Sequence, residues 1–201
     1  MARLAVFGGS FDPPHLGHLI LAEEALAALD LEQVLWVLTP QPPHKRGQSL
    51  SPVPIRLQMV AQAIQGNSRF VLSRVDLERP GPQYAVDTVD ILRSESPGHE
   101  WTFLIGEDSL RDLPTWSRSR ELIEKCTLGV MRRPGIRWDE KSLERDLPGI
   151  GQRLRFFPAP FVDISSTQIR QRAREGRPIR YLVPHGVWEV IEQSGIYRHP
   201  A

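Results

Sequence analysis

Two histidines near the N-terminus, His15 and His18, stand three residues apart with Gly17 between them. Residues at this spacing share one face of a helix, and we predict a helix that starts near Leu16. The free N–H groups and the dipole of a helix N-terminus favour an anion. Gly17 leaves room for a flat ligand against the backbone. Two histidine donors at a helix N-terminus therefore predict a phosphate-binding site.

The strand end before these histidines carries Gly8 and Gly9, which allow the backbone to turn or to approach a ligand closely. The spacing is not G-x-G-x-x-G and no G-K-[ST] follows, so neither a dinucleotide oxidoreductase nor a P-loop ATPase is predicted. A zinc site is disfavoured because no third ligand stands at a suitable spacing. For this stretch taken alone, a turn with incidental histidines is the remaining alternative.

Short apolar runs alternate with segments of helical periodicity along the chain. We expect strands over 3–9, 34–38, 70–73, 101–106 and 127–131 and a shorter one within 154–162, with helices from about 16, over 55–64, 84–92, 121–124 and 165–175, and after 184. This alternation predicts an α/β fold, a Rossmann-like doubly wound parallel sheet with helices on both faces. We expect a single domain over 1–201, with the helices of about 165–197 packed on it and an exposed excursion over 132–151.

The composition of the 201 residues, 40% hydrophobic and 24% charged, is typical of a globular domain. Lys plus Arg number 25 and Asp plus Glu 24, so net charge predicts no partner. Because no signal-peptide pattern and no apolar run of about 18 residues is found, we expect a cytoplasmic protein with no membrane partner. The single cysteine, Cys126, has apolar neighbours that predict a buried, unreactive thiol.

The segment GGSFDPPHLGH resembles the N-terminal signature of the nucleotidylyltransferase superfamily, whose H-x-G-H motif binds the phosphates of ATP. Further segments are similar, in the same order, to those of the bacterial nicotinate-nucleotide adenylyltransferases: PPHK, YAVDT, FLIGEDSLRDLPTW, VMRRPG, ISSTQIR and YLVPHGVWEVIEQSGIY. Each segment alone is a weak or moderate signal. Their common order makes the resemblance specific.

The resemblance implies transfer of the adenylyl group of ATP to nicotinate mononucleotide, which gives nicotinate adenine dinucleotide and pyrophosphate. The motifs supply no evident covalent nucleophile, so catalysis would rest on positioning and charge stabilisation. Mg²⁺ is expected with ATP, held mainly by phosphates and water and not by a protein metal site. The expected partners are ATP and nicotinate mononucleotide, with no nucleic acid, while a homo-oligomer stays open.

Two alternatives remain at this stage. One is another transferase of the superfamily, acting on phosphopantetheine or on a choline- or glycerol-type phosphate, against which the paired YAVDT and LPTW segments argue. The other is a non-catalytic nucleotide- or RNA-binding protein on the same fold, against which the intact H-x-G-H argues.

The resemblance also implies roles for individual residues. The expected catalytic residues, with His18 nearest the transferring phosphorus, are His15, His18, Lys45 and Arg170. The residues expected to bind the nucleotide are Gly8, Gly9, Ser10, Phe11, Gly17, Gly106, Asp108, Ser165, Ser166 and Thr167. The residues expected to bind the mononucleotide are His44, Tyr84, Ala85, Thr88 and Trp116.

Several of these residues also have a structural interpretation. Ser165 or Ser166 is a suitable helix N-cap. Asp108 is a candidate both for holding ribose hydroxyls and for capping the helix that follows. Trp116 either stacks on the pyridine ring or packs against its own domain.

Other polar side chains have structural roles as the alternative. Asp12 would orient the turn, and Asp87 and Thr88 would belong to helix packing. A solvated helix face is expected for a basic cluster with no interleaved aromatic side chain, namely Arg172, Arg174, Arg177 and Arg180.

Ala85 departs from the family pattern, in which Thr is common at this position. No arginine in the neighbouring sequence is an obvious partner for a substrate carboxylate. Tyr84 and Ala85 stand at the start of a predicted helix, where free backbone N–H groups favour an anion. We therefore expect recognition of nicotinate by backbone groups, and a preference for nicotinate over nicotinamide that Ala85 does not abolish.

Overall fold

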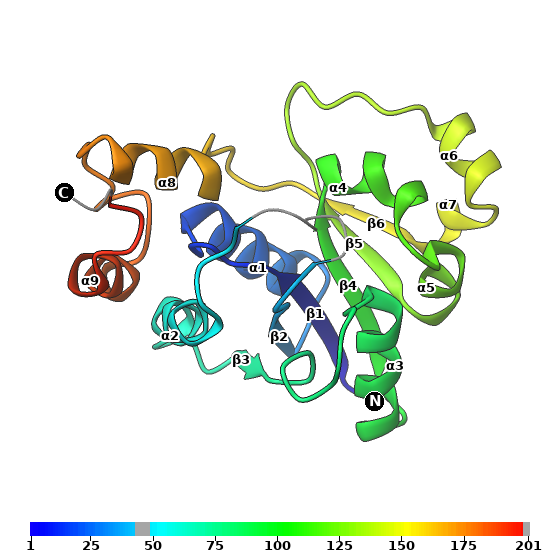
Figure 1. The fold of residues 1–201 in the computed structure, drawn as a ribbon. Coiled ribbons are helices and arrows are strands. Elements are labelled where there is room, and N and C mark those ends of the chain that lie inside the picture. The colour runs from blue at the N-terminus through cyan, green and yellow to red at the C-terminus, as the bar shows by residue number, and fades with distance from the viewer. Residues whose placement is uncertain (43–48, 199–201) are drawn as a thin grey trace.

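The computed structural model describes residues 1–42 and 49–198, and a parallel sheet forms the centre of this part (Figure 1). Its six strands have the order β3-β2-β1-β4-β5-β6. They are β1 (Arg3–Gly9), β2 (Gln33–Leu38), β3 (Phe70–Ser73), β4 (Glu100–Gly106), β5 (Thr127–Met131) and β6 (Leu154–Phe157). The predicted doubly wound parallel sheet is confirmed.

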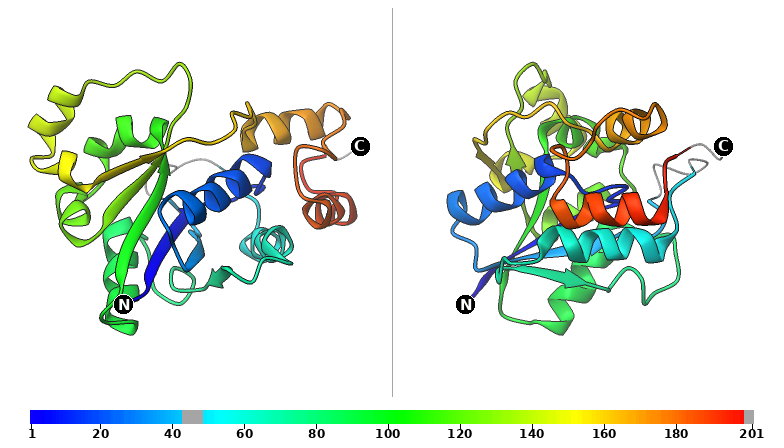
Figure 2. Two further views of the ribbon diagram at one scale, coloured as in Figure 1. Left: turned by 180° about the vertical axis from the view of Figure 1, so that it is seen from behind. Right: turned by 90° about the vertical axis from the view of Figure 1, so that its left-hand side faces the viewer.

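Helices cover both faces of the sheet (Figures 1 and 2). One face packs against α1 (Leu16–Ala28), α2 (Val53–Ile64), α8 (Ser166–Arg174) and α9 (His185–Ser194). The other packs against α3 (Ala85–Glu95), α4 (Glu107–Asp112), the 3-10 turn η2 (Leu113–Thr115), α5 (Ser119–Lys125), α6 (Glu140–Asp146) and α7 (Ile150–Arg153).

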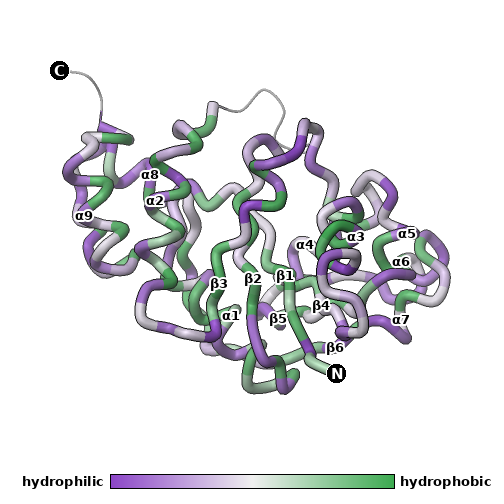
Figure 3. Tube along the Cα trace, turned by 90° about the horizontal axis from the view of Figure 1, so that it is seen from below, coloured by the Kyte–Doolittle hydropathy of each residue, from purple (hydrophilic) through white to green (hydrophobic). Residues whose placement is uncertain are grey.

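The sheet separates two hydrophobic cores. Side chains alternate between the faces of a strand, so in β1 Ala5 and Phe7 enter the core under α1 and α2 while Val6 enters the opposite core. Hydrophobic residues accordingly follow the strands through the middle of the molecule (Figure 3). The helices of the C-terminal region join the first core, to which α8 contributes Ile169 and α9 contributes Val187.

Helix α9 lies alongside α2 (Figure 2). The approach is close at Gly186, because a Cβ added there would collide with Oε1 of Gln62. The last helix thereby fixes the C-terminal segment near the N-terminal half of the sheet.

The structure differs from the predictions in two segments that have little helical periodicity. Residues 107–115 form α4 and η2, so Asp108 lies inside a helix and Gly106, not Asp108, is the N-cap. The excursion over 132–151 contains α6 and α7, and Leu143, Leu147 and Ile150 are buried against the second core. The expectation of an exposed excursion is therefore wrong for these apolar residues.

Cys126 follows α5 and is 3% exposed. Burial raises the pKa of its thiol to about 12. The predicted burial of this thiol is confirmed. Within residues 1–42 and 49–198, no helix is long and apolar enough to cross a membrane.

Candidate functional site

The turn after β1 lies where the winding of the sheet changes direction. Strands β1 and β4 are neighbours, but β1 leads to α1 on one face and β4 leads to α4 on the other. In open α/β sheets this divergence leaves a crevice at the carboxyl ends of the strands, where ligands bind. The turn is close to β4, since a Cβ on Gly8 would stand 3.5 Å from Cζ of Phe103.

His15 and His18 lie side by side at the start of α1. The centres of their rings are 3.7 Å apart, as the shared helix face predicts. The backbone N–H of His15 donates to Nδ1 of His18 at 3.1 Å. Because this Nδ1 accepts, the proton of a neutral His18 is on Nε2, which makes Nε2 the donor nitrogen of the ring.

His15 has a different environment from His18. It is 5% exposed, and within the described residues its Nδ1 has no hydrogen-bond partner. Burial, with a smaller effect from the charge of Arg133, lowers the pKa of His15 to about 4. His15 is therefore neutral at pH 7 and offers a ligand an N–H dipole, not a full charge.

The N-terminus of α1 is only partly available to an anion. The N–H of Leu16 donates to the carbonyl oxygen of Leu182 at 3.1 Å, because the segment between α8 and α9 passes over the helix start. The expectation that the N–H groups here are free is therefore wrong for the first of them.

The glycines and Phe11 shape this turn. Phe11 has a left-handed backbone, with φ of 44°, and is 2% exposed. Its ring fills the place of a side chain on Gly9, where a Cβ would stand 3.0 Å from the ring. The same ring packs edge-on against His18, at 5.3 Å between centres. Gly17 is equally constrained, since its Cβ would stand 3.1 Å from Nδ1 of His15.

The ISST segment at the start of α8 lies against the same turn. Ser166 Oγ donates to the carbonyl oxygen of Pro13 at 2.8 Å, although the two residues are 153 positions apart. Arg170 donates to the carbonyl oxygen of Asp12 at 2.7 Å and to Oγ1 of Thr167 at 3.3 Å. Ser165 is the N-cap of α8, as predicted, because its Oγ accepts from the N–H of Gln168.

Gly106 at the end of β4 and Asp108 in α4 lie near a further cation, Arg133, which follows β5. Nε of Arg133 is 3.6 Å from Oδ1 of Asp108, and the charge of Arg133 acts on His15. The backbone N–H of Arg133 donates to Glu107, a carboxylate only 6% exposed. Sequence analysis did not single out Arg133, although it belongs to the VMRRPG segment.

The start of α3 is held by a buried polar cluster. The hydroxyl of Thr88 donates to Asp76 at 2.7 Å, and Arg79 pairs with the same carboxylate oxygen at 2.8 Å. Arg79 also donates to the carbonyl oxygen of Tyr84 at 3.2 Å. Thr88 thus has the packing role that was the alternative for it.

Two arginines lie near this helix start, and both are already paired with acidic side chains. Arg79 is 3.8 Å from Asp87, and Arg118 pairs with both Asp87 and Glu121. Their acidic partners neutralise them, and the hydrogen bonds to Glu121 and Asp87 raise the pKa of Arg118. No other described residue accepts a hydrogen bond from the N–H groups of Tyr84 and Ala85, so these backbone donors stay available.

Trp116 follows η2 and is half-buried. Its ring stands edge-on to Phe103, with 6.1 Å between centres. The residue therefore packs against its own domain and keeps part of its ring at the surface.

His44 and Lys45 lie outside the described residues. The remaining predicted residues occupy two places. The first comprises the β1–α1 turn, the end of β4 and the start of α8. The second comprises the start of α3 and Trp116.

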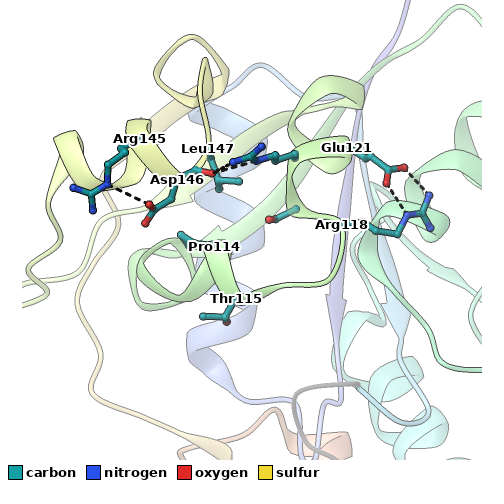
Figure 4. Close-up of a pocket in the computed structure, with 9 residues that line it drawn as sticks. Pro114, Thr115, Arg118, Glu121, Arg145, Asp146 and Leu147 are labelled. Atoms are coloured by element: carbon teal, nitrogen blue, oxygen red, sulfur yellow. Dashed lines mark hydrogen bonds and ion pairs between the residues drawn. The ribbon is translucent and has the colours of Figure 1, made fainter.

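Two hollows of the described surface bear on the position of the site. The larger, of about 650 Å³, is between α5 and the end of α6 and contains none of the predicted residues (Figure 4). Its arginines are already engaged, Arg118 with Glu121, and Arg120 with the carbonyl oxygen of Asp146. The smaller lies beside Gly17 and is bordered by Met131, Arg132, Arg133, Phe161 and Val162, among others. We therefore place the candidate site at the turn and not in the larger hollow.

A metal ion has no evident protein cage here. Within residues 1–42 and 49–198, no three His, Cys, Asp or Glu side chains are close enough to one another to hold one.

A parallel sheet with paired histidines and the ISST segment at its crevice is the arrangement of a nucleotidyltransferase. The cytidylyltransferase-like family model matches residues 6–172. A protein of Thermomicrobium roseum named "Probable nicotinate-nucleotide adenylyltransferase" is 46% identical over 198 residues, which cover 98% of this chain and 92% of that protein. One of Thermus thermophilus with the same name is 42% identical over 98% of this chain and 100% of that protein.

The fold is also that of a solved structure titled as the nicotinic acid mononucleotide adenylyltransferase of Plasmodium falciparum complexed with NaAD. The TM-score is 0.80 at 18% identity, over 98% of both chains. The chain belongs to the cytidylyltransferase-like family and, within it, to the nicotinate-nucleotide adenylyltransferases.

Proposed function

We propose that this protein transfers the adenylyl group of ATP to nicotinate mononucleotide, in NAD biosynthesis, with release of pyrophosphate. The observation that carries the proposal is the contact of the H-x-G-H turn with the ISST segment, through Ser166 and Arg170, in a chain 46% identical to a relative of that name. We also propose that residues 1–201 act as a single domain, because α8 and α9 share the core of the sheet.

The reaction is an in-line displacement. A phosphate oxygen of the mononucleotide attacks the α-phosphorus of ATP, and the bond to the bridging oxygen breaks so that pyrophosphate leaves. His18 is suited to donate from Nε2 to the α-phosphate, where negative charge develops. Arg170, with Ser166, is suited to hold the leaving phosphates. Lys45 is proposed to neutralise the attacking phosphate.

The adenosine is proposed to lie on the other side of Gly17. The smaller hollow there has the exposed apolar side chains Phe161 and Val162, which suit a flat base. Asp108, in the first turn of α4 after the end of β4, is suited to accept from ribose hydroxyls.

The mononucleotide is proposed to bind between Trp116 and the start of α3. Trp116 would stack on the pyridine ring, and the N–H groups of Tyr84 and Ala85 would donate to its carboxylate. Mg²⁺ bound to ATP would supply charge neutralisation, with phosphate oxygens and water as its ligands.

A substrate panel tests this function. Pyrophosphate release is measured with ATP and, in turn, nicotinate mononucleotide, nicotinamide mononucleotide, phosphopantetheine, choline phosphate and glycerol phosphate. We expect the highest kcat/KM with nicotinate mononucleotide. Turnover with phosphopantetheine alone would reassign the substrate, and ATP binding without any pyrophosphate release would reject catalysis.

A further inference from the structure

A buried arginine, Arg56, contacts the β1–α1 turn. Arg56 on α2 is 1% exposed and donates to four backbone carbonyl oxygens. These belong to Ser10 at 2.9 Å, Thr39 at 3.1 Å, Pro40 at 2.7 Å and Ser51 at 2.8 Å. One side chain therefore joins three separate segments of the chain at the crevice.

Asp12 is the anion of the same cluster and is 2% exposed. One carboxylate oxygen accepts from the N–H of Ser51 at 3.1 Å, and the other accepts from the hydroxyl of Tyr197. Its carbonyl oxygen accepts from Arg170. Asp12 is thus held by Ser51, which precedes α2, by Arg170 of α8 and by Tyr197 of the C-terminal segment.

The buried charges of Arg56 and Asp12 explain why this cluster holds the turn in one geometry. Burial lowers the pKa of Arg56, and the nearby carboxylate of Asp12 opposes that effect. Burial and the charge of Asp12 raise the pKa of Tyr197, so the phenol remains a hydrogen-bond donor. A buried charge is costly unless its hydrogen bonds are made, so loss of one partner should move the turn that the others hold.

We infer that Arg56 and Tyr197 are positioning residues for adenylyl transfer, acting through Ser10 and Asp12 on the turn that carries His15 and His18. The inference rests on the proposed function. Tyr197 gives the clearer test of the inference, because it contacts the turn from the segment after α9. Its ring packs against the first core, so removal of the hydroxyl alone leaves that packing in place.

The test is Tyr197→Phe, with Tyr181→Phe as the matched control because Tyr181 is 83% exposed. For Tyr197→Phe we expect kcat/KM for ATP to fall by about 10-fold, the usual effect of one hydrogen bond to a charged group. KM for nicotinate mononucleotide should change less than about 2-fold. Tyr181→Phe should match wild type. A purely structural role would lower the melting temperature and leave both kinetic constants unchanged, which would overturn the inference.

Calorimetry with ATP separates this inference from the proposed function. Weaker ATP binding by Tyr197→Phe than by Tyr181→Phe supports positioning even if no transfer product forms. Equal binding and equal turnover in the two variants reject it. Arg56→Lys keeps the charge but not the planar fork of donors. We expect it to fold and to share the ATP defect, whereas wild-type kinetics in Arg56→Lys would overturn the positioning role of Arg56.

Discussion

The N-termini of α1 and α3 flank the same crevice but differ in what their backbones offer a ligand. At α1 the N–H of Leu16 is taken by the carbonyl oxygen of Leu182. At α3, no other described residue accepts a hydrogen bond from the N–H groups of Tyr84 and Ala85. The same sequence argument predicts free donors at both helices. It fails at α1 because a distant segment supplies an acceptor.

We propose that this difference divides anion binding between side chains and backbone. At α1, side chains would then supply most of the interaction with phosphate, namely those of His15, His18 and Arg170. At α3 the nearby arginines, Arg79 and Arg118, are paired with carboxylates, so the backbone is left to bind an anion. Substitutions of side chains should therefore be costly at α1, while loss of a backbone donor should matter at α3.

The largest effect is expected for His18→Ala. Loss of a preorganised donor to transition-state charge typically lowers the rate about 10²–10³-fold. We expect kcat of the purified variant to fall by this amount with an unchanged circular dichroism spectrum. His185→Ala is the control, since the side chain of His185 is 65% exposed on α9. A near wild-type kcat for His18→Ala would place the phosphate site elsewhere.

His15 should make stability depend on pH. Its pKa is lowered from 6.5 to about 4 in the folded protein, so the unfolded state binds more protons between these values. The contribution is complete above pH 6.5 and is lost as the pH falls towards 4, to a total of about 3 kcal/mol. Urea unfolding at pH 7.5, 6 and 5 measures it. His15→Gln should lose this part of the pH dependence, and parallel curves for the two proteins would contradict the assignment.

Trp116→Ala should weaken binding of the mononucleotide far more than binding of ATP. A stacked aromatic contact is worth roughly 1–3 kcal/mol. Separate KM values for the two substrates measure the effect. Trp188→Ala on α9 controls for loss of a tryptophan elsewhere. An increase confined to the KM for ATP would reject the stacking role.

The smallest effect concerns nicotinate against nicotinamide. A carboxamide would turn its NH₂ towards a backbone donor, which leaves polar groups unpaired at about 1–3 kcal/mol. We expect kcat/KM to favour nicotinate mononucleotide by at least about 10-fold. Side-by-side rates at saturating ATP measure the ratio, and equal rates would contradict backbone recognition.

Ala85→Pro sharpens this last test. Proline is tolerated at the first position of a helix and removes only the N–H there. Tyr84, with ψ of 142°, already has the extended backbone that a residue before proline needs. We expect Ala85→Pro to reduce the preference and Ala85→Thr, the matched control, to retain it. A full preference in Ala85→Pro would exclude a role for this N–H.

Much of the fold follows from the sequence because alternating strands and helices leave few arrangements. The strand end with Gly8 and Gly9 and the helix face of His15 and His18 are local patterns, and both lie as predicted. Helices α4, α6 and α7 have four to seven residues and were not predicted, because so few residues give only a weak periodic signal.

The site's supporting contacts were not predictable, because they join residues distant in sequence. Nothing near Leu16 indicates that Leu182 will cap it. Nothing near Asp12 indicates Tyr197. Arg79 stands only five positions before Tyr84, yet its pairing with Asp76 is what makes it unavailable. The reactive side chains of the turn are close together in the sequence, whereas the residues that hold the turn in place are distant from it.

The buried thiol of Cys126 makes this chain convenient for spectroscopy. With its pKa raised to about 12, almost none of it is thiolate at neutral pH, and maleimide dyes react with the thiolate. It is the single cysteine of the chain. A cysteine introduced at an exposed position would therefore take up a fluorophore selectively without removal of the native one. Two such labels, on α8 and α3, would report the width of the crevice by energy transfer as each substrate is added.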